Sequence, residues 1–116
     1  GPMAVRQQMN VTMAEVIADR FRLLAEPTRI RILDALRAGP LTVGALSAQI
    51  ASSQQNVSKH LGLLHRAGLL LREKDGNNVR YGIADQGVFS LCDEVCGGIQ
   101  RHLNELTSTM EEGVTR

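Results

Sequence analysis

The stretch from residue 52 to residue 83 decides the fold and reads SSQQNVSKHLGLLHRAGLLLREKDGNNVRYGI. Ser52 and Gln55 stand in the S-x-x-Q relation of a capping box, so a helix is expected to begin near Ser53. Gly68 follows the last expected turn, at the position where a left-handed residue commonly ends a helix. The stretch therefore predicts a helix that starts on polar residues and stops at a glycine.

The expected helix has two different faces. Val57, Leu61 and Leu64 recur at helical spacing and form one apolar stripe. The residues off this stripe are small or polar, namely Gln54, Gln55, Ser58, Lys59 and Gly62. Glutamine can pair with adenine, serine with any base, and lysine with guanine or a phosphate. This face has the chemistry of a DNA reader, although an ordinary solvated helix face would carry the same residue types.

A hairpin is expected directly after the helix. Residues 69–71 begin a strand, residues 75–78 (Asp-Gly-Asn-Asn) have turn chemistry, and Val79, Tyr81 and Ile83 alternate as a second strand should. A helix followed by such a hairpin is the layout of a winged helix-turn-helix, which places one helix in the DNA major groove.

Three segments resemble the ArsR family of bacterial winged-helix repressors. Residues 24–33 (LAEPTRIRIL) resemble the family's signature on its second helix, residues 56–69 (NVSKHLGLLHRAGL) its recognition helix, and residues 75–81 (DGNNVRY) its wing. The matches have the family's order and spacing across residues 24–83. The resemblance implies a homodimer, paired through its first and last helices, that binds operator DNA when free. Many such repressors release DNA when a metal ion, a metalloid or a thiol oxidant reaches a sensing site.

The expected DNA-binding residues lie on the recognition helix and the wing: Gln54, Gln55, Ser58, Lys59, His60, Asn77 and Arg80. Residues 53–81 hold five basic against two acidic side chains, a net charge of +3, whereas residues 82–116 hold two against six, a net charge of −4. A basic surface in the reading segment fits phosphate contact, although the excess is small enough for a solvated face.

The composition and motifs of the chain argue against several other classes of function. The chain has 116 residues and a net charge of +1, and it contains no Trp and only three Phe and Tyr residues, too few for stacking on single-stranded nucleic acid. No phosphate loop or nucleophile–base motif is present, so an enzyme is not expected. Two cysteines, no signal peptide and no membrane-length apolar run predict a cytoplasmic protein without a membrane partner. A winged helix that binds protein instead of DNA stays an open alternative.

The expected order of elements is α-α-α-α-β-β-α, mainly helical with a small β-hairpin wing. Residues 1–11 are expected to be a cloning remnant, Gly1-Pro2, followed by a flexible N-terminus. Residues 12–110 are expected to form the winged helix-turn-helix domain with its dimerisation helices, and residues 111–116 a flexible tail. The last helix is expected to be capped by Asp85 and to carry a broad apolar stripe.

Two cysteines form the candidate sensing site. Cys92 and Cys96 are four residues apart on the expected last helix and so share one face. Two thiolates at this spacing can bind a soft metal or metalloid, or they can be oxidised, although a disulfide within one helix has poor geometry. The alternative is that both are small buried hydrophobic residues, in which case the regulator senses no ligand. The sequence requires no cofactor, and a soft metal or metalloid is the candidate ligand.

The chain departs from the family's metal-sensing patterns. Arsenic-responsive members often carry Cys-Val-Cys on the third helix, where this chain has Thr42-Val43-Gly44. Zinc-responsive members often pair an Asp with a His near the start of the last helix, but Asp85 has no such partner here. His102 and Glu105 have the spacing of the second zinc pair, which supplies only half of that site.

Overall fold

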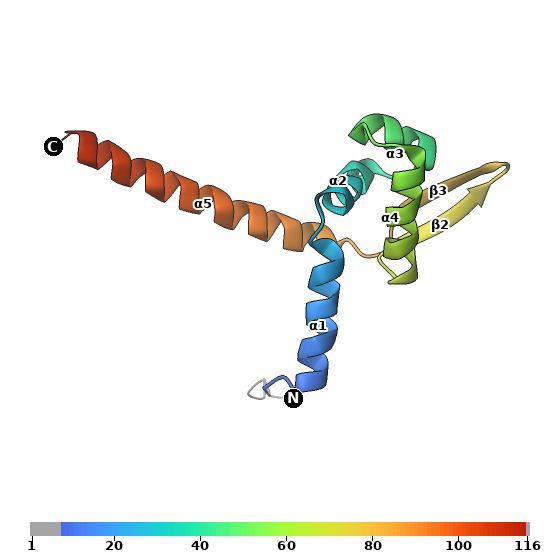
Figure 1. Cartoon of the computed structure of the whole chain (residues 1–116), viewed down its shortest axis with the longest axis horizontal. Helices are drawn as coiled ribbons and strands as arrows, with labels where there is room; N and C mark the ends of the chain where they lie inside the picture. The colour runs from blue at the N-terminus through green and yellow to red at the C-terminus, as the bar shows by residue number, and fades with distance from the viewer. Residues whose placement is uncertain (1–7, 116) are drawn as a thin grey trace. The chain divides into compact units, whose positions relative to one another are not determined.

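The computed structural model describes residues 8–115. The elements, drawn in Figure 1, follow in chain order: α1 (Val11–Leu24), α2 (Pro27–Ala35), the short 3₁₀ helix η1 (Leu36–Ala38), β1 (Leu41–Thr42), α3 (Val43–Ile50), α4 (Gln54–Arg66), β2 (Leu70–Asp75), β3 (Asn78–Ile83) and α5 (Gly87–Thr115). The chain divides into two compact units, one ending at Ala84 and the other starting at Asp85. The first unit holds α1 to β3, and the second holds α5.

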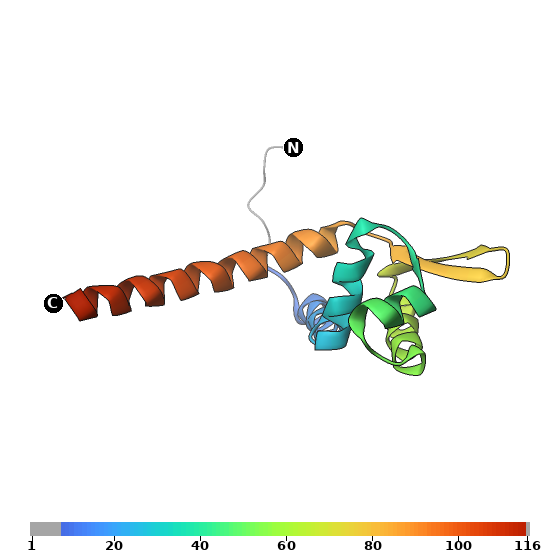
Figure 2. The same ribbon diagram turned by 90° about the horizontal axis from the view of Figure 1, so that it is seen from above.

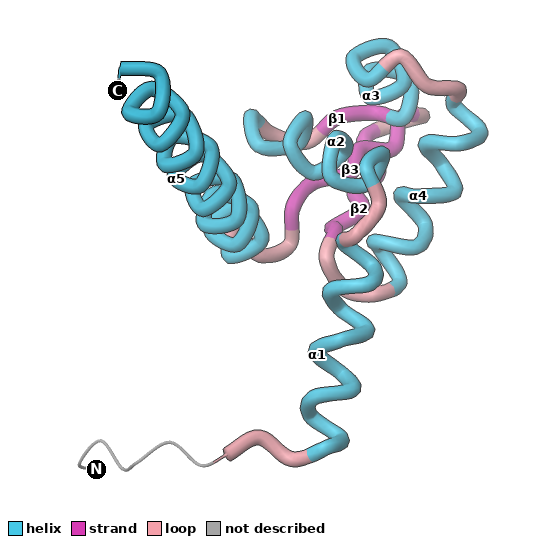
Figure 3. Tube along the Cα trace, turned by 60° about the vertical axis from the view of Figure 1, so that its left-hand side comes forward, coloured by secondary structure: helices cyan, strands magenta, loops and turns pink. Residues whose placement is uncertain are grey.

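The core of the first unit lies where α2, α3 and α4 pack against one another and where β2 packs against α4. Figure 3 shows these three helices beside the small sheet. The buried core residues are almost all aliphatic: Ile32, Leu33, Leu36, Leu46, Ile50, Val57, Leu61, Leu64, Leu69 and Leu70. Removing such side chains from water is the main force holding the three helices together.

The sheet has three antiparallel strands in the order β1-β3-β2. The wing hairpin predicted from the sequence is confirmed: Asp75 pairs with Asn78, so the predicted turn over residues 75–78 encloses a two-residue loop, Gly76 and Asn77. Gly76 has a φ of +63°, which a residue without Cβ adopts at little cost. β1 was not predicted, because two residues carry too little pattern to reveal a strand. Figure 2 shows the hairpin projecting away from the helices of its unit.

Helix α4 ends as its glycine predicts. Gly68 has a φ of +83° and follows the cap residue Ala67. The Gly68 N–H donates to the His65 carbonyl at 2.9 Å, and the Leu69 N–H donates to the Leu64 carbonyl at 3.0 Å. This is the Schellman pattern of hydrogen bonds, and it turns the chain directly into β2.

Helix α5 begins as expected and ends later. The Asp85 carboxylate accepts a hydrogen bond from the Gly87 N–H at 2.8 Å, which confirms its predicted capping role. Residues 111–115, expected to lie in a flexible tail, continue α5 in the structure, and the flexibility of residues 111–116 stays a prediction. No proline interrupts the end of the chain, and Glu111 and Glu112 favour helix.

The remaining predictions on domain limits stay predictions. Gly1-Pro2 and the rest of residues 1–7 lie outside the described residues. The prediction of one domain across residues 12–110 likewise stays a prediction, and within these limits the chain forms two compact units that meet at Ala84 and Asp85 in the sequence. Within residues 8–115, none of the helices combines the length and the apolar character that crossing a membrane requires.

Candidate nucleic-acid interface

The first turn of α4 is held by two serines. The Ser53 hydroxyl accepts from the Asn56 N–H at 3.1 Å and is the N-cap. The Asn56 side-chain amide donates to the Ser52 hydroxyl at 3.0 Å. The predicted start of the helix is therefore confirmed, although Ser53 caps it where the capping-box pattern placed Ser52.

Helix α4 separates a buried face from an exposed one. The buried face consists of Val57, His60, Leu61 and Leu64. The exposed face includes the residues predicted to read DNA, which are Gln54, Gln55, Ser58 and Lys59. All four therefore lie where a duplex can reach them.

Arg66 extends this exposed face and was not predicted as a site residue. A Cβ on Gly62 would lie 3.0 Å from Nη1 of Arg66, so the guanidinium lies over the glycine. The i, i+4 spacing of the two residues was the signal available in the sequence. Gly62 thus makes room for a cation on the outer side of α4.

The turn between α3 and α4 is fixed by hydrogen bonds between two serines. The Ser52 N–H donates to the Ser47 carbonyl at 3.2 Å, and the Ser47 hydroxyl donates to the Ser52 carbonyl. Ala51 between them has a φ of +53°, a left-handed conformation that is costly for a residue with Cβ. At the other end of α3, the Thr42 hydroxyl caps the helix by accepting a hydrogen bond from the Ala45 N–H at 3.2 Å.

Tyr81 joins the wing to the end of α4. Its hydroxyl accepts a hydrogen bond from Nε of Arg72 at 3.2 Å, across the β2–β3 pair. Its ring meets the His65 ring edge-on, with centroids 6.2 Å apart and an interplanar angle of 83°. The position of the hairpin is thereby tied to the last turn of α4.

The two predicted wing residues are both exposed. Nη1 of Arg80 lies 3.8 Å from Oδ2 of Asp75, and the two side chains are 50% and 70% exposed. Such a surface pair contributes little stability, so Arg80 can leave Asp75 for a phosphate at small cost. Asn77 lies exposed in the two-residue loop at the tip of the wing.

His60 does not lie on the reading face, so its prediction as a DNA contact is wrong. The residue is only 6% exposed. Nε of Arg29 donates to its Nδ1 at 3.1 Å, and Oε2 of Glu26 lies 3.8 Å from its Nε2. The residue stands three positions after Val57 and so belongs to the buried stripe, a periodicity that its polar character concealed.

Cys92 and Cys96 are free thiols on α5, the first half-buried and the second exposed. In the described part of the chain, no three His, Cys, Asp or Glu side chains gather closely enough to hold a metal ion. One chain therefore offers two sulfurs, fewer than the four ligands of a closed zinc site.

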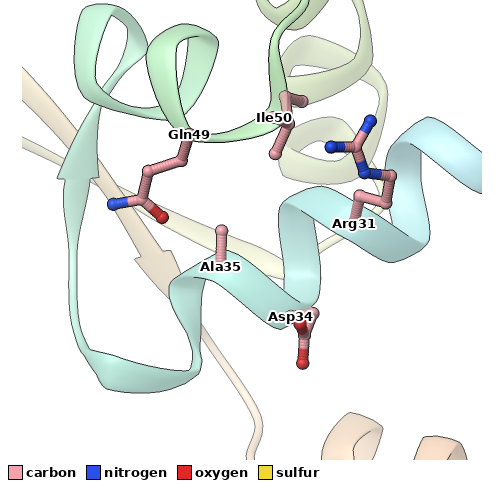
Figure 4. A pocket seen from close by; sticks show the side chains of 5 residues that line it. All are labelled: Arg31, Asp34, Ala35, Gln49 and Ile50. Carbon is pink, nitrogen blue, oxygen red and sulfur yellow. The ribbon is translucent and has the colours of Figure 1, made fainter.

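A small hollow lies between α2 and α3, away from the residues predicted to bind DNA. Figure 4 shows the side chains that line it: Arg31, Asp34, Ala35, Gln49 and Ile50. Its volume of about 200 Å³ is below the roughly 300 Å³ at which small-molecule sites begin. We assign it no ligand.

Comparison with known proteins identifies the family. A helix-turn-helix domain family matches residues 24–73. A transcriptional repressor SmtB homolog from Synechocystis is 35% identical over 92 residues, which cover 79% of this chain and 70% of that protein. The chain belongs to the ArsR/SmtB family.

Solved structures of similar proteins agree with this assignment. The AntR antimony-specific transcriptional repressor superposes with a TM-score of 0.76 at 30% identity, over 90% of this chain and 96% of that one. The homodimeric winged helix-turn-helix DNA-binding domain of Mb0332 from Mycobacterium bovis, a possible ArsR-family regulator, gives 0.73 at 26% identity, over 89% and 95%. The predicted family and the winged helix-turn-helix fold are confirmed, and this ArsR/SmtB member is a DNA-binding transcriptional regulator and not an enzyme.

The buried His60 has a perturbed charge state. Burial lowers its pKa, and the nearby cations Arg29 and Lys59 lower it further, which together outweigh the opposite effect of the Glu26 carboxylate. For Glu26, burial by itself raises the pKa, but hydrogen bonds from the backbone N–H groups of Arg29 and Thr28 and the nearby positive charges lower it overall. A neutral imidazole therefore faces a carboxylate near neutral pH.

This lowered pKa makes the stability of the fold depend on pH. In the unfolded chain a histidine has a pKa of about 6.5, whereas His60 in the folded protein takes up its proton only at lower pH. The unfolded state then holds more protons, so stability is full above about pH 6.5 and falls as pH drops below it. We expect urea denaturation between about pH 8 and pH 5 to show this loss. Because one proton is involved, the free energy of unfolding should change by at most about 1.4 kcal/mol per pH unit.

His60→Asn keeps a side-chain oxygen near the place of Nδ1 but takes up no proton, so its unfolding free energy should change less over this range. The exposed His102 of α5 supplies the control, and His102→Asn should retain the slope of the parent. An unchanged slope in His60→Asn, or greater stability of the parent in acid, would contradict the assignment.

Proposed function

We propose that this chain is a homodimeric repressor that binds a near-palindromic operator, with one α4 helix in the major groove of each half-site. The observation that carries the proposal is the two-faced α4, whose buried side is fixed in the core while its glutamines, serine and lysine point outward. In helix-turn-helix dimers, half-site centres lie about one DNA turn, or a multiple of it, apart.

The exposed side chains of α4 and the wing are suited to different contacts, with base edges and with phosphates respectively. Gln54, Gln55 and Ser58 have the donors and acceptors to pair with base edges, and Lys59 can reach guanine or a phosphate. Arg80 and Asn77 belong to the wing, where contacts to the phosphate backbone would set the register of the protein on the duplex.

The charge distribution supports the same orientation. The segment from residue 53 to residue 81 has a net charge of +3, and the segment from residue 82 to residue 116 has a net charge of −4. The basic segment includes α4 and the wing. Because binding releases counterions from the duplex, the affinity should fall steeply as the salt concentration rises.

The proposed dimer rests on apolar surface that one chain leaves exposed. On α5 the exposed apolar residues recur every three or four positions and so form one face: Val95, Ile99, Leu103, Leu106 and Met110. On α1 the exposed apolar residues are Val11, Met13, Val16 and Phe21. Exposed patches of this kind mark interaction sites, and the similar Mycobacterium bovis domain is a homodimer. A second copy of this chain is therefore the proposed partner.

The proposed sensing role belongs to Cys92 and Cys96. Both are free thiols one helical turn apart on the helix with the exposed apolar face, and soft metals and metalloids prefer such ligands. A solved relative, AntR, is an antimony-specific repressor. We extend the proposal to a soft metal or metalloid, or a thiol oxidant, that acts on this pair and weakens operator binding. A ligand can do this only if its affinity differs between the two arrangements of the dimer.

Changing Gln55 and Arg80 separates base reading from phosphate contact. Gln55→Ala should relax the preference at one base pair by about 1–3 kcal/mol, the worth of a good base contact. Arg80→Ala should weaken binding to all duplexes alike and flatten the salt dependence. Binding is measured by fluorescence anisotropy on a duplex selected by the parent protein from a random pool, with single-base variants of that duplex.

Three results would reject this assignment. Gln55→Ala could leave the preference among variants intact, Arg80→Ala could act on one sequence only, or the parent could bind no duplex. The last result would favour a winged helix that binds protein.

Ile99→Glu tests the dimer, with Gln100→Glu as the matched control on the neighbouring, polar position. Ile99 is 58% exposed on the apolar face of α5. Ile99 would be buried in both copies of the dimer. Losing that burial makes the free energy of association less favourable by about 3 kcal/mol, which corresponds to roughly hundredfold weaker association. Analytical ultracentrifugation should show a dimer for the parent and Gln100→Glu, and a shift to monomer for Ile99→Glu. A monomeric parent, or an unaffected Ile99→Glu, would contradict the interface.

Cys92→Ser combined with Cys96→Ser tests the sensing role. In the parent protein, arsenite, Zn²⁺ or hydrogen peroxide should lower duplex affinity by about 5–150-fold, the usual range of allosteric coupling. The double variant should bind the duplex like the parent and ignore all three reagents. If it still responds, the thiols are packing residues and any sensing site lies elsewhere.

A further inference from the structure

Arg29 joins three helices of the first unit through its backbone and side chain. It belongs to α2, and its Nη1 donates to the carbonyl of Leu23 in the last turn of α1 at 2.8 Å. Its Nε donates to Nδ1 of His60 in α4 at 3.1 Å. One guanidinium therefore connects the end of α1 with the buried face of the helix proposed to read DNA.

The backbone of Arg29 is held in place by the N-cap of α2. Glu26 is the N-cap of α2, and its carboxylate accepts a hydrogen bond from the Arg29 backbone N–H at 3.0 Å. A guanidinium has donors in a planar fork and reaches two acceptors at once, whereas an ammonium on a flexible stem does not keep that geometry. The connection thus depends on arginine and not merely on a positive charge.

The bond to His60 exists only while the imidazole is neutral. Nδ1 accepts a hydrogen bond from the Nε–H of Arg29, so the neutral imidazole carries its own proton on Nε2. A second proton would occupy Nδ1, remove the acceptor and place a positive charge against the guanidinium. The protonated ring has another partner in Glu26, whose Oε2 is 3.8 Å from Nε2. Neutral His60 can therefore hold Arg29 at Nδ1 and Glu26 at Nε2 together, whereas charged His60 keeps only Glu26.

We propose that Arg29 is a positioning residue for DNA binding, and that its bond to His60 is a proton-sensitive link between α1 and α4 whose loss in acid weakens duplex binding. This inference rests on the proposed function, in which α4 reads the duplex. It adds a regulatory input, protons, that is independent of the cysteines on α5.

The charged groups around His60 fit this role. From α2 come Glu26 and Arg29, and from α4 comes Lys59. Helix α3 has no charged residue, and the charged side chains at the outer end of β2, residues 72–75, are exposed. Leu23 of α1 contributes its carbonyl. The opposite charges of Glu26 and Arg29 thus act in opposite directions on the addition of a second proton to the imidazole.

The link through Arg29 joins two helices whose exposed surfaces have different proposed roles, dimer formation for α1 and base reading for α4. Helix α1 exposes Val16 and Phe21, which belong to the apolar surface proposed for the dimer. Helix α4 exposes the side chains proposed to read bases. A shift of α4 against the end of α1 would therefore change how the reading face is presented to DNA.

The first test is a pH profile of duplex affinity at constant salt, from about pH 8 to pH 5, with the parent-selected duplex. The parent should lose affinity on acidification by about fivefold or more, the lower end of typical coupling. His60→Asn should give a flatter profile, because its oxygen can accept from Arg29 without titrating. His102→Asn, at an exposed position of α5, should keep the parent profile.

Arg29→Lys tests whether the link requires a planar guanidinium that reaches two acceptors at once. It retains the charge but not the two-acceptor geometry, so it should bind the duplex about fivefold or more weakly near pH 8 and show a shallower profile. Arg31→Lys, at an exposed position of the same helix, should match the parent. Parent-like binding by Arg29→Lys, or a full acid response in His60→Asn, would overturn the link. Circular dichroism at each pH confirms that every variant is folded.

A measurement on the unaltered protein covers the case in which His60→Asn or Arg29→Lys fails to fold. If protonation of His60 weakens duplex binding, then the duplex must lower the pKa of His60 by the same factor, since linkage is reciprocal. NMR titration of the imidazole in the free and duplex-bound protein should show that decrease. Equal pKa values in both states would reject the link while leaving the proposed function intact. Absence of duplex binding at every pH would reject the proposed function itself.

Discussion

The burial of one side of α4 is the constraint on which the rest of the structure depends. Val57, Leu61 and Leu64 have no exposed surface, and they pack where α2, α3 and β2 meet. Each such side chain contributes about 1.5–3 kcal/mol when removed from water. Because a helix is rigid, fixing these three also fixes the rotation of α4 about its axis. Gln55 and Ser58 consequently face outward without needing any support of their own.

The local interactions at both ends of α4 complete this arrangement. Ser53 begins the helix, Gly68 ends it, and the paired hydrogen bonds between Ser47 and Ser52 fix its angle to α3. Tyr81 then joins the wing to the final turn of the helix. These contacts place a basic hairpin beside a polar helix face, which is the arrangement that major-groove recognition with backbone support requires.

Much of this could be predicted from the sequence because the signals are local. The apolar spacing from Val57 to Leu64, the glycine stop and the turn residues of the wing each follow from interactions within a few positions, and each is confirmed. The contacts that were missed depend on distant segments. His60 meets Arg29 across 31 positions, and β1 exists only because Leu41 finds Tyr81 in β3. The assignment of Gln54, Gln55, Ser58, Lys59, Asn77 and Arg80 to DNA, and of the cysteines to sensing, stays a prediction.

The most direct test of the account is to titrate the ¹⁵N-labelled protein with its selected duplex and follow each backbone amide by NMR. The account predicts that the largest shifts occur in residues 54–59 of α4 and residues 76–80 of the wing, and that both sets weaken with added salt. Shifts confined to α1 or α5, with residues 54–59 unchanged at saturating duplex, would contradict the claim that the outer face of α4 reads DNA.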